Sequence, residues 1–218
     1  MSVSRGSAAA TAARVADRTV SPARARAEAE AKTLIEAALA VLRAHGTAGF
    51  TVAAVLAEAG LSTRAFYRHF ASKDELLLAL FDADTEVVAA RVDRAIDASS
   101  EPRAALEAWI DQQLALAYAP RRSRRTEVLW TEGRRLQLDH PDEFARIVAA
   151  VLAPLERVLA AGLERGTFPA CDPARDARAI HAVTWDLVER RLAGGSDSLA
   201  SARAQVLRFC LPALGARP

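Results

Sequence analysis

Residues 60–73 bring basic, hydroxyl and aromatic side chains together at helical spacing. The sequence of this stretch is GLSTRAFYRHFASK, and it contains no acidic residue. Phe66 and Phe70 lie four positions apart and would face a hydrophobic core, whereas the arginines and Tyr67 would point away from it. A short helix that is apolar on one side and basic on the other suits the phosphate-lined major groove of DNA. We therefore predict a DNA recognition helix over residues 62–70.

Two earlier helices would have to position this stretch. Ser21 and Pro22 form a typical helix start, since Ser can cap a helix and Pro fits its first position. An apolar period then extends to about residue 45. Thr51 would cap a short helix that Gly60 ends, because Gly tolerates the positive φ of a helix stop. Two short helices joined by a glycine turn indicate a helix-turn-helix, so we expect residues 21–72 to form a DNA-binding domain.

The remaining sequence predicts helices throughout. The chain is 51% hydrophobic and 26% charged, and it is rich in Ala with few β-branched runs, which favours helix. Apolar periodicity and Pro or Gly breaks predict about nine helices in an all-α fold. Those after residue 72 are expected over about 73–98, 102–118, a segment after Pro120, 141–165, 173–192 and 197–211. We expect residues 73–218 to form a larger helical domain.

Residues 1–20 are rich in Ser, Ala, Thr and Arg without a sustained apolar period, which predicts a flexible basic arm. Arg5, Arg14 and Arg18 would either enter the minor groove of DNA or belong to a solubilising tail. Residues 1–80 hold 10 Lys and Arg against 7 Asp and Glu, while the rest of the chain holds 19 against 20. The excess positive charge therefore accompanies the predicted recognition helix.

Other function classes find little support in the composition. Cys171 and Cys210 have no metal-ligand or CxxC spacing, so we expect buried thiols, with a redox role as the alternative. The four histidines lie far apart without paired carboxylates, so neither a metal site nor a cofactor is expected. No segment has the apolar length of a membrane span and no secretory h-region is present, so we expect a cytoplasmic protein.

The stretch of residues 60–73, followed by Leu76 and Leu77 and preceded by Thr51 at the matching distance, resembles the signature of the TetR/AcrR family of bacterial transcriptional regulators. The resemblance covers about residues 30–80. It implies base contacts in the major groove from Thr63, Arg64 and Ala65. It implies phosphate contacts from Thr51, Tyr67, His69 and Lys73, to which we add Ser62 and Arg68; His69 could instead pack. Ala53 stands where many members have a polar residue, so the second helix would contribute little to base reading.

The resemblance also implies a helical domain that binds a ligand and forms a dimer. A pocket in a helix bundle is mostly apolar with a few polar groups. The candidates for its lining are Trp109, Trp130, Phe144, His181 and Trp185, although each could be plain core and His181 a satisfied core histidine. The last two helices would form the homodimer interface, through Ile180, Val183, Thr184, Leu187, Val206, Phe209 and Cys210.

The sequence thus predicts a ligand-responsive transcriptional regulator, most simply a repressor. A homodimer would bind double-stranded, palindromic operator DNA and be released by a small, mostly apolar effector. A transcriptional activator would use the same residues. An all-α enzyme or small-molecule-binding protein is the alternative from another class, but it would need a catalytic set. Asp186 and Glu189, beside Arg190, look like a solvated polar face, and we identify no catalytic residue.

Overall fold

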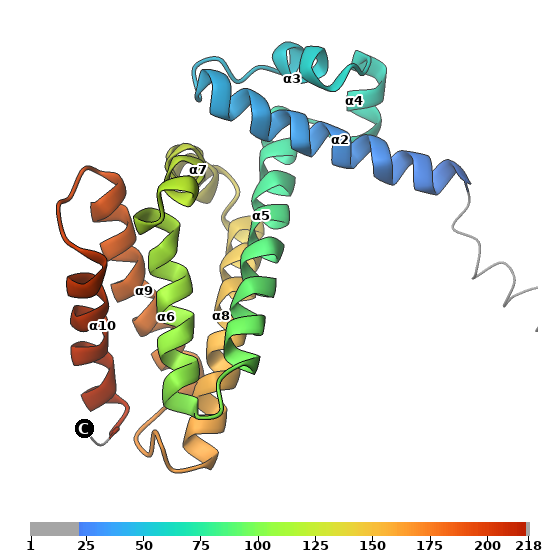
Figure 1. Cartoon of the computed structure of the whole chain (residues 1–218). Helices are drawn as coiled ribbons and strands as arrows, with labels where there is room; N and C mark the ends of the chain where they lie inside the picture. The colour runs from blue at the N-terminus through green and yellow to red at the C-terminus, as the bar shows by residue number, and fades with distance from the viewer. Residues whose placement is uncertain (1–21, 217–218) are drawn as a thin grey trace, which may run out of the picture.

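The computed structural model describes residues 22–216, which form nine α-helices and no strand (Figure 1). This confirms the predicted all-α fold, and where bounds were predicted the helices agree with them within two residues. The predicted arm, residues 1–20, lies outside the described residues. The helices are α2 (Pro22–His45), α3 (Val52–Ala59), α4 (Thr63–His69), α5 (Lys73–Asp97), α6 (Pro102–Tyr118), α7 (Pro120–Asp139), α8 (Pro141–Glu164), α9 (Pro173–Leu192) and α10 (Leu199–Ala213).

Side-chain caps set the limits of the short helices. The hydroxyl of Thr51 accepts a hydrogen bond from the Ala54 N–H at 3.1 Å, and that of Ser62 accepts one from the Ala65 N–H at 3.2 Å. Gly60, with φ +64°, provides the left-handed turn that ends α3 and allows α4 to begin three residues later. The turn between the two short helices is therefore encoded by local residues alone.

Helices α2, α3 and α4 lie across one end of the molecule, and α5 runs from them along the side of a bundle that contains α6, α8, α9 and α10 (Figure 1). Helix α7 crosses the end of that bundle nearest to α2 and packs against both α2 and α6. Helices α5 and α7 are thus the elements through which the N-terminal helices meet the bundle. None of the helices between residues 22 and 216 is both long and apolar enough to cross a membrane.

Two hydrophobic clusters stabilise the molecule. One fills the bundle, and the other holds α2, α3 and α4 together around Phe50, Phe66 and Phe70. The second cluster also contains Leu76, Leu77 and Leu80 of α5 and Leu129 and Leu136 of α7. Apolar packing therefore continues across the predicted domain boundary between residues 72 and 73. Helix α7 and the N-terminal helices therefore share one close-packed core.

The position of Leu136 allows a test of this packing. Leu136 is fully buried in the cluster that α7 shares with the N-terminal helices, whereas Leu138, two positions along α7, is 82% exposed. We expect Leu136→Ala to lower the free energy of unfolding by about 2–5 kcal/mol, because it opens a cavity in the shared cluster. Leu138→Ala is the matched control and should change it by less than about 0.5 kcal/mol. Urea denaturation measures both, and equal losses would contradict the shared core.

Candidate functional site

Helix α4 has one packed side and one exposed side. Phe66 is fully buried, while Tyr67 is 60% exposed and Thr63 and Arg64 also face solvent. Ala65 was predicted to contact bases, but its side chain is only 5% exposed because it lies on the packed side beside Phe66. Of the three predicted base-reading residues, only Thr63 and Arg64 therefore present side chains to an outside partner.

Glu30 of α2 holds the C-terminal end of α4. Its Oε2 atom lies 3.1 Å from His69 Nε2 and accepts a hydrogen bond of 3.1 Å from Arg68 Nη1, while Arg26 donates to Oε1 at 3.1 Å. The hydrogen bond with His69 is the largest cause that lowers the pKa of Glu30, followed among the lowering causes by the neighbouring arginines. The side chain of His69 is only 10% exposed, so its ring is mainly a link between α2 and α4.

The predicted phosphate-binding residues differ in how free they are. Lys73 Nζ donates to the carbonyl oxygen of Phe50 at 3.4 Å and lies 5.4 Å from the centre of the Phe50 ring. Thr51 and Ser62 use hydroxyl oxygen lone pairs to cap helices, which leaves each O–H as a donor. Tyr67 is open to solvent. The hydroxyl groups and Tyr67 can therefore reach an external acceptor directly, whereas Lys73 would first leave the Phe50 carbonyl.

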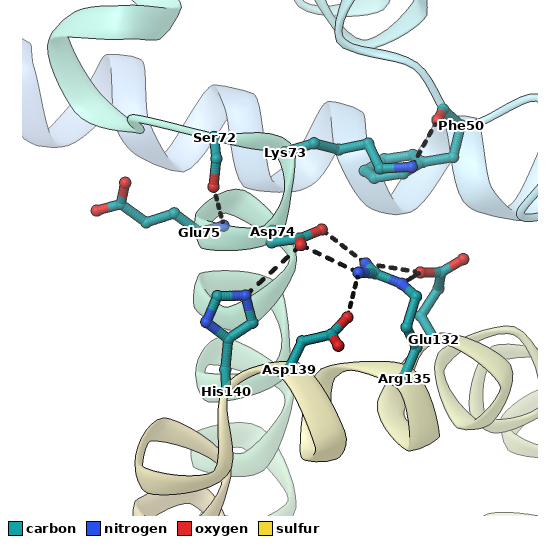
Figure 2. Close-up of polar contacts among 9 residues, drawn as sticks. All are labelled: Phe50, Ser72, Lys73, Asp74, Glu75, Glu132, Arg135, Asp139 and His140. Atoms are coloured by element: carbon teal, nitrogen blue, oxygen red, sulfur yellow. Dashed lines mark hydrogen bonds and ion pairs between the residues drawn. The ribbon is translucent and has the colours of Figure 1, made fainter.

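A bidentate ion pair joins α5 to α7 directly below this unit. Arg135 of α7 donates to both oxygens of Asp74, at 2.6 Å to Oδ1 and 3.0 Å to Oδ2 (Figure 2). Arg135 also contacts Glu132 and Asp139, and His140 Nε2 lies 3.5 Å from Asp74 Oδ2. The hydrogen bond from Arg135 is the largest cause that lowers the pKa of Asp74, and the same bond raises the pKa of Arg135. The fork geometry fixes the distance and orientation between the two helices.

The structure contains a cavity of about 390 Å³ among helices α5 to α9. Its walls carry the aromatic rings of Phe81, Trp130, Phe144 and Trp185, and His181 also lines it. Four of the five predicted lining residues thus surround one cavity. Trp109 does not line it: this residue is fully buried, with its ring 6.3 Å from that of His181, and its Nε1 has no hydrogen-bond partner among the described residues.

Glu189 is the main polar residue of the cavity that the sequence analysis missed. Its Oε1 atom accepts hydrogen bonds from Trp130 Nε1 at 3.1 Å and from Trp185 Nε1 at 3.0 Å. The prediction that Glu189 belongs to a solvated face was therefore wrong. Asp186 is exposed as expected, and it forms an ion pair with Arg190. Trp185 lies four residues before Glu189 on α9, so this spacing was visible in the sequence. The contact from Trp130 on another helix was not.

His181 completes this side of the cavity. Its ring stacks on Trp185, with 5.9 Å between the centroids and an interplanar angle of 10°. Burial lowers the pKa of His181, so the imidazole is neutral near pH 7. Burial raises the pKa of Cys171 and of Cys210 to about 12, which keeps both thiols protonated and disfavours a redox role. No group of residues within the described chain has the composition of a metal site.

The predicted dimer residues on α9 and α10 fall into two groups. Most of them pack inside the single chain, because their side chains face the bundle and leave little surface for a partner: Ile180, Thr184, Leu187, Val206 and Cys210. Phe209 is 58% exposed, and with Val183 it borders a shallow hollow that Ala182, Asp186, Gln205 and Arg208 also line. The interface prediction therefore needs correction for those five residues, and only Val183 and Phe209 remain as candidates.

Known proteins are similar to this chain in sequence and in fold. Residues 34–80 match the family described as bacterial regulatory proteins, tetR family. The chain is 30% identical over 184 residues to the HTH-type transcriptional repressor SCO4008 of Streptomyces coelicolor, which covers 78% of this chain and 87% of that protein. It is 31% identical over 154 residues to the HTH-type transcriptional regulator Rv1816 of Mycobacterium tuberculosis, which covers 68% of this chain and 63% of that regulator.

Among solved structures, the transcriptional regulator FadR from Bacillus subtilis, in complex with stearoyl-CoA, has a TM-score of 0.69 at 18% identity over 84% of this chain and 98% of FadR. At that identity the likeness concerns the fold.

A helix-turn-helix unit joined to a helical bundle defines a DNA-binding transcriptional regulator. The chain belongs to the tetR family of bacterial regulatory proteins. This membership also decides against the alternative of an all-α enzyme, because the relatives are regulators of transcription.

The Asp74–Arg135 pair predicts a pH dependence of stability. The pKa of Asp74 is lowered from 3.8 in the folded protein, so its stabilising contribution is complete above pH 3.8 and is lost as the pH falls through the folded value. We expect Asp74→Asn to lower the free energy of unfolding at pH 7 by about 1 kcal/mol, since the pair is partly exposed and solvent screens it. The difference from the unmodified protein should shrink as the pH falls below 3.8.

Denaturation by urea at a series of pH values measures this difference. Asp82→Asn is the matched control, because Asp82 lies on the exposed side of the same helix. A deficit of Asp74→Asn that stayed constant down to the lowest pH, or one that the control shared, would contradict the assigned role of the pair.

Proposed function

We propose that this protein is a repressor that binds a palindromic operator as a homodimer and leaves it when a small, largely apolar effector enters the cavity among α5 to α9. The observation that carries the proposal is that one helix, α7, borders the cavity through Trp130 and holds the first turn of α5 through Arg135. The name of the related Streptomyces coelicolor protein supports repression as the direction of control. The stearoyl-CoA complex of FadR supports the binding of a ligand by a protein of this fold.

In this proposal α4 enters the major groove. Arg64 would bind guanine O6 and N7, since its guanidinium matches that pair of acceptors, and Thr63 would contact a neighbouring base. Phosphate contacts would come from Tyr67, from the capping hydroxyls of Thr51 and Ser62, and from Arg68, Lys73 and His69 once these three exchange their internal partners. Ala65 is left out because its methyl group is buried.

A homodimer supplies the second recognition helix. A helix of seven residues contacts too few bases for specificity, and a two-fold pair would read half-sites about 34–36 Å apart. The exposed Phe209 and the hollow beside Val183 make the outer faces of α9 and α10 the proposed contact surface. An apolar side chain of this size at the surface favours such a role.

Release would follow from the geometry of α7. An effector in the cavity contacts Trp130, and Arg135 lies five residues further along the same helix. A shift of α7 would displace Asp74 through the bidentate pair, and with it the start of α5 and the helix-turn-helix unit. The effector must bind the released state more tightly than the operator-bound state, by a coupling free energy that is typically about 1–3 kcal/mol.

Substitutions on the exposed face of α4 should separate base reading from phosphate binding. We expect Arg64→Ala to reduce discrimination between operator and random DNA by about 1–3 kcal/mol, because it removes a base contact. Tyr67→Phe should weaken both complexes by similar factors, because a phosphate contact carries no sequence information. Electrophoretic mobility shifts with a selected genomic fragment and a shuffled fragment measure both effects.

Arg146→Ala, which removes an exposed arginine of α8, is the control and should leave both affinities unchanged. Unchanged operator binding in both α4 variants would rule out this helix as the recognition element.

The ion pair between α5 and α7 should be required for the response. We expect Arg135→Ala to bind operator and effector with nearly normal affinities, while the effector weakens operator binding much less than in the unmodified protein. A compound found by thermal-shift screening of small metabolites can serve as effector in titrations with and without DNA. Arg157→Ala is the matched control, because Arg157 also ties the bundle to α5, through Asp93 further along that helix. If the effector still released the Arg135→Ala variant fully from the operator, the proposed route would be refuted.

A further inference from the structure

The chemistry of the cavity wall suggests which class of effector it takes; this inference rests on the proposed function of the cavity. The side chain of Glu189 lies partly buried in the wall and bonds to two indoles. Indole N–H groups are neutral donors, so they leave the charge of a carboxylate uncompensated. No cationic side chain that the structure describes forms an ion pair with Glu189. A partly buried charge without a counterion has lost some of its hydration, and a cationic ligand would offset that loss.

The other ionisable groups of the lining are also compatible with a cationic ligand. Among the side chains that the structure describes, the ionisable ones that line the cavity are Asp84, Arg134, His181 and Glu189, and Asp84 has an interaction of its own. His181 is neutral because burial lowers its pKa, and Arg134 is exposed to solvent at the edge. Neither His181 nor Arg134 forms an ion pair with Glu189, so the charge of its carboxylate is open to a cationic ligand. At this carboxylate an anionic group would be repelled, whereas a cation would be attracted.

Aromatic rings surround this carboxylate. Trp130 and Trp185 lie beside Glu189 because their N–H groups bond to it, and Phe81 and Phe144 contact each other across the α5–α8 side of the cavity with 6.0 Å between centroids. The faces of aromatic rings attract organic cations, most strongly those of Trp. A cavity of about 390 Å³ is large enough for a drug-sized molecule rather than a bare ion.

We propose that the effector is a hydrophobic organic cation, such as a protonated amine or a quaternary onium ion on an aromatic or aliphatic body. Its charge pairs with Glu189, and its apolar body packs against the rings of Phe81, Trp130, Phe144 and Trp185. This ion pair uses the same carboxylate group of Glu189 that accepts the hydrogen bond from Trp130 Nε1. The effector therefore acts on α7 at the point where this helix borders the cavity.

Two ions of nearly equal shape and opposite charge test the proposal on the unmodified protein. Isothermal titration calorimetry with tetraphenylphosphonium and with tetraphenylborate should show at least tenfold tighter binding of the phosphonium. Glu189→Gln keeps an oxygen for the two indoles but removes the charge, and it should weaken phosphonium binding at least tenfold. Glu86→Gln, on the exposed side of α5 and outside the cavity, should bind as the unmodified protein does.

Equal binding of the two ions, tighter binding of the borate, or no binding of the phosphonium up to about millimolar concentration would overturn the proposal. Because these comparisons use the unmodified chain, they remain decisive even if Glu189→Gln does not fold. Operator release, followed in parallel by mobility shift, separates this inference from the proposed function. Release by an acyl-CoA or by the borate, but not by the phosphonium, would refute the cationic effector while leaving the repressor model intact. Phosphonium binding that depends on Glu189 but does not release the operator would support the cationic ligand and refute the proposed release mechanism.

Discussion

The bidentate pair between Asp74 and Arg135 is the contact on which the arrangement of the two halves depends. It fixes the first turn of α5 against α7, at the level where the helix-turn-helix unit meets the bundle (Figure 2). Next to it in the chain, Lys73 holds the Phe50 carbonyl, so the pair is one residue away from a direct hydrogen bond to the N-terminal unit. Leu129 and Leu136 reinforce the contact with apolar packing. The position of α4 therefore follows the position of α7.

Helix α7 has a second role because it also forms part of the cavity wall. Trp130 bonds to Glu189 across the cavity, and Arg135 bonds to Asp74 outside it. A ligand that changes the first bond therefore acts on the same rigid element that makes the second. At the far side of the unit, Glu30 holds His69 and Arg68 against α2, so α4 responds as part of a body and not as a loose helix. This continuity is the physical basis of the proposed coupling between ligand and DNA.

The sequence predicts what depends on neighbouring residues. Helix limits followed from Thr51, Gly60 and Ser62, and the fold class followed from composition and periodicity. The sequence does not show which helices distant in the chain contact each other. For this reason Glu189 was wrongly predicted to be solvated, and Glu30 was not predicted to hold α4. The predicted dimer residues show the same limit, because periodicity identifies an apolar face but not whether the bundle or a partner covers it. For Ile180 and Val206 the bundle does. Ala65 was misplaced because it lies at the border of the packed side of α4.

The central claim, that paired α4 helices recognise a specific DNA sequence, is tested most directly by selecting bound genomic fragments with the purified protein near physiological salt and footprinting the enriched sequence. The account predicts an inverted repeat, with two protected half-sites centred about 34–36 Å apart or a multiple of one helical turn. Enrichment of no common sequence, or protection of a single site without two-fold symmetry, would contradict it.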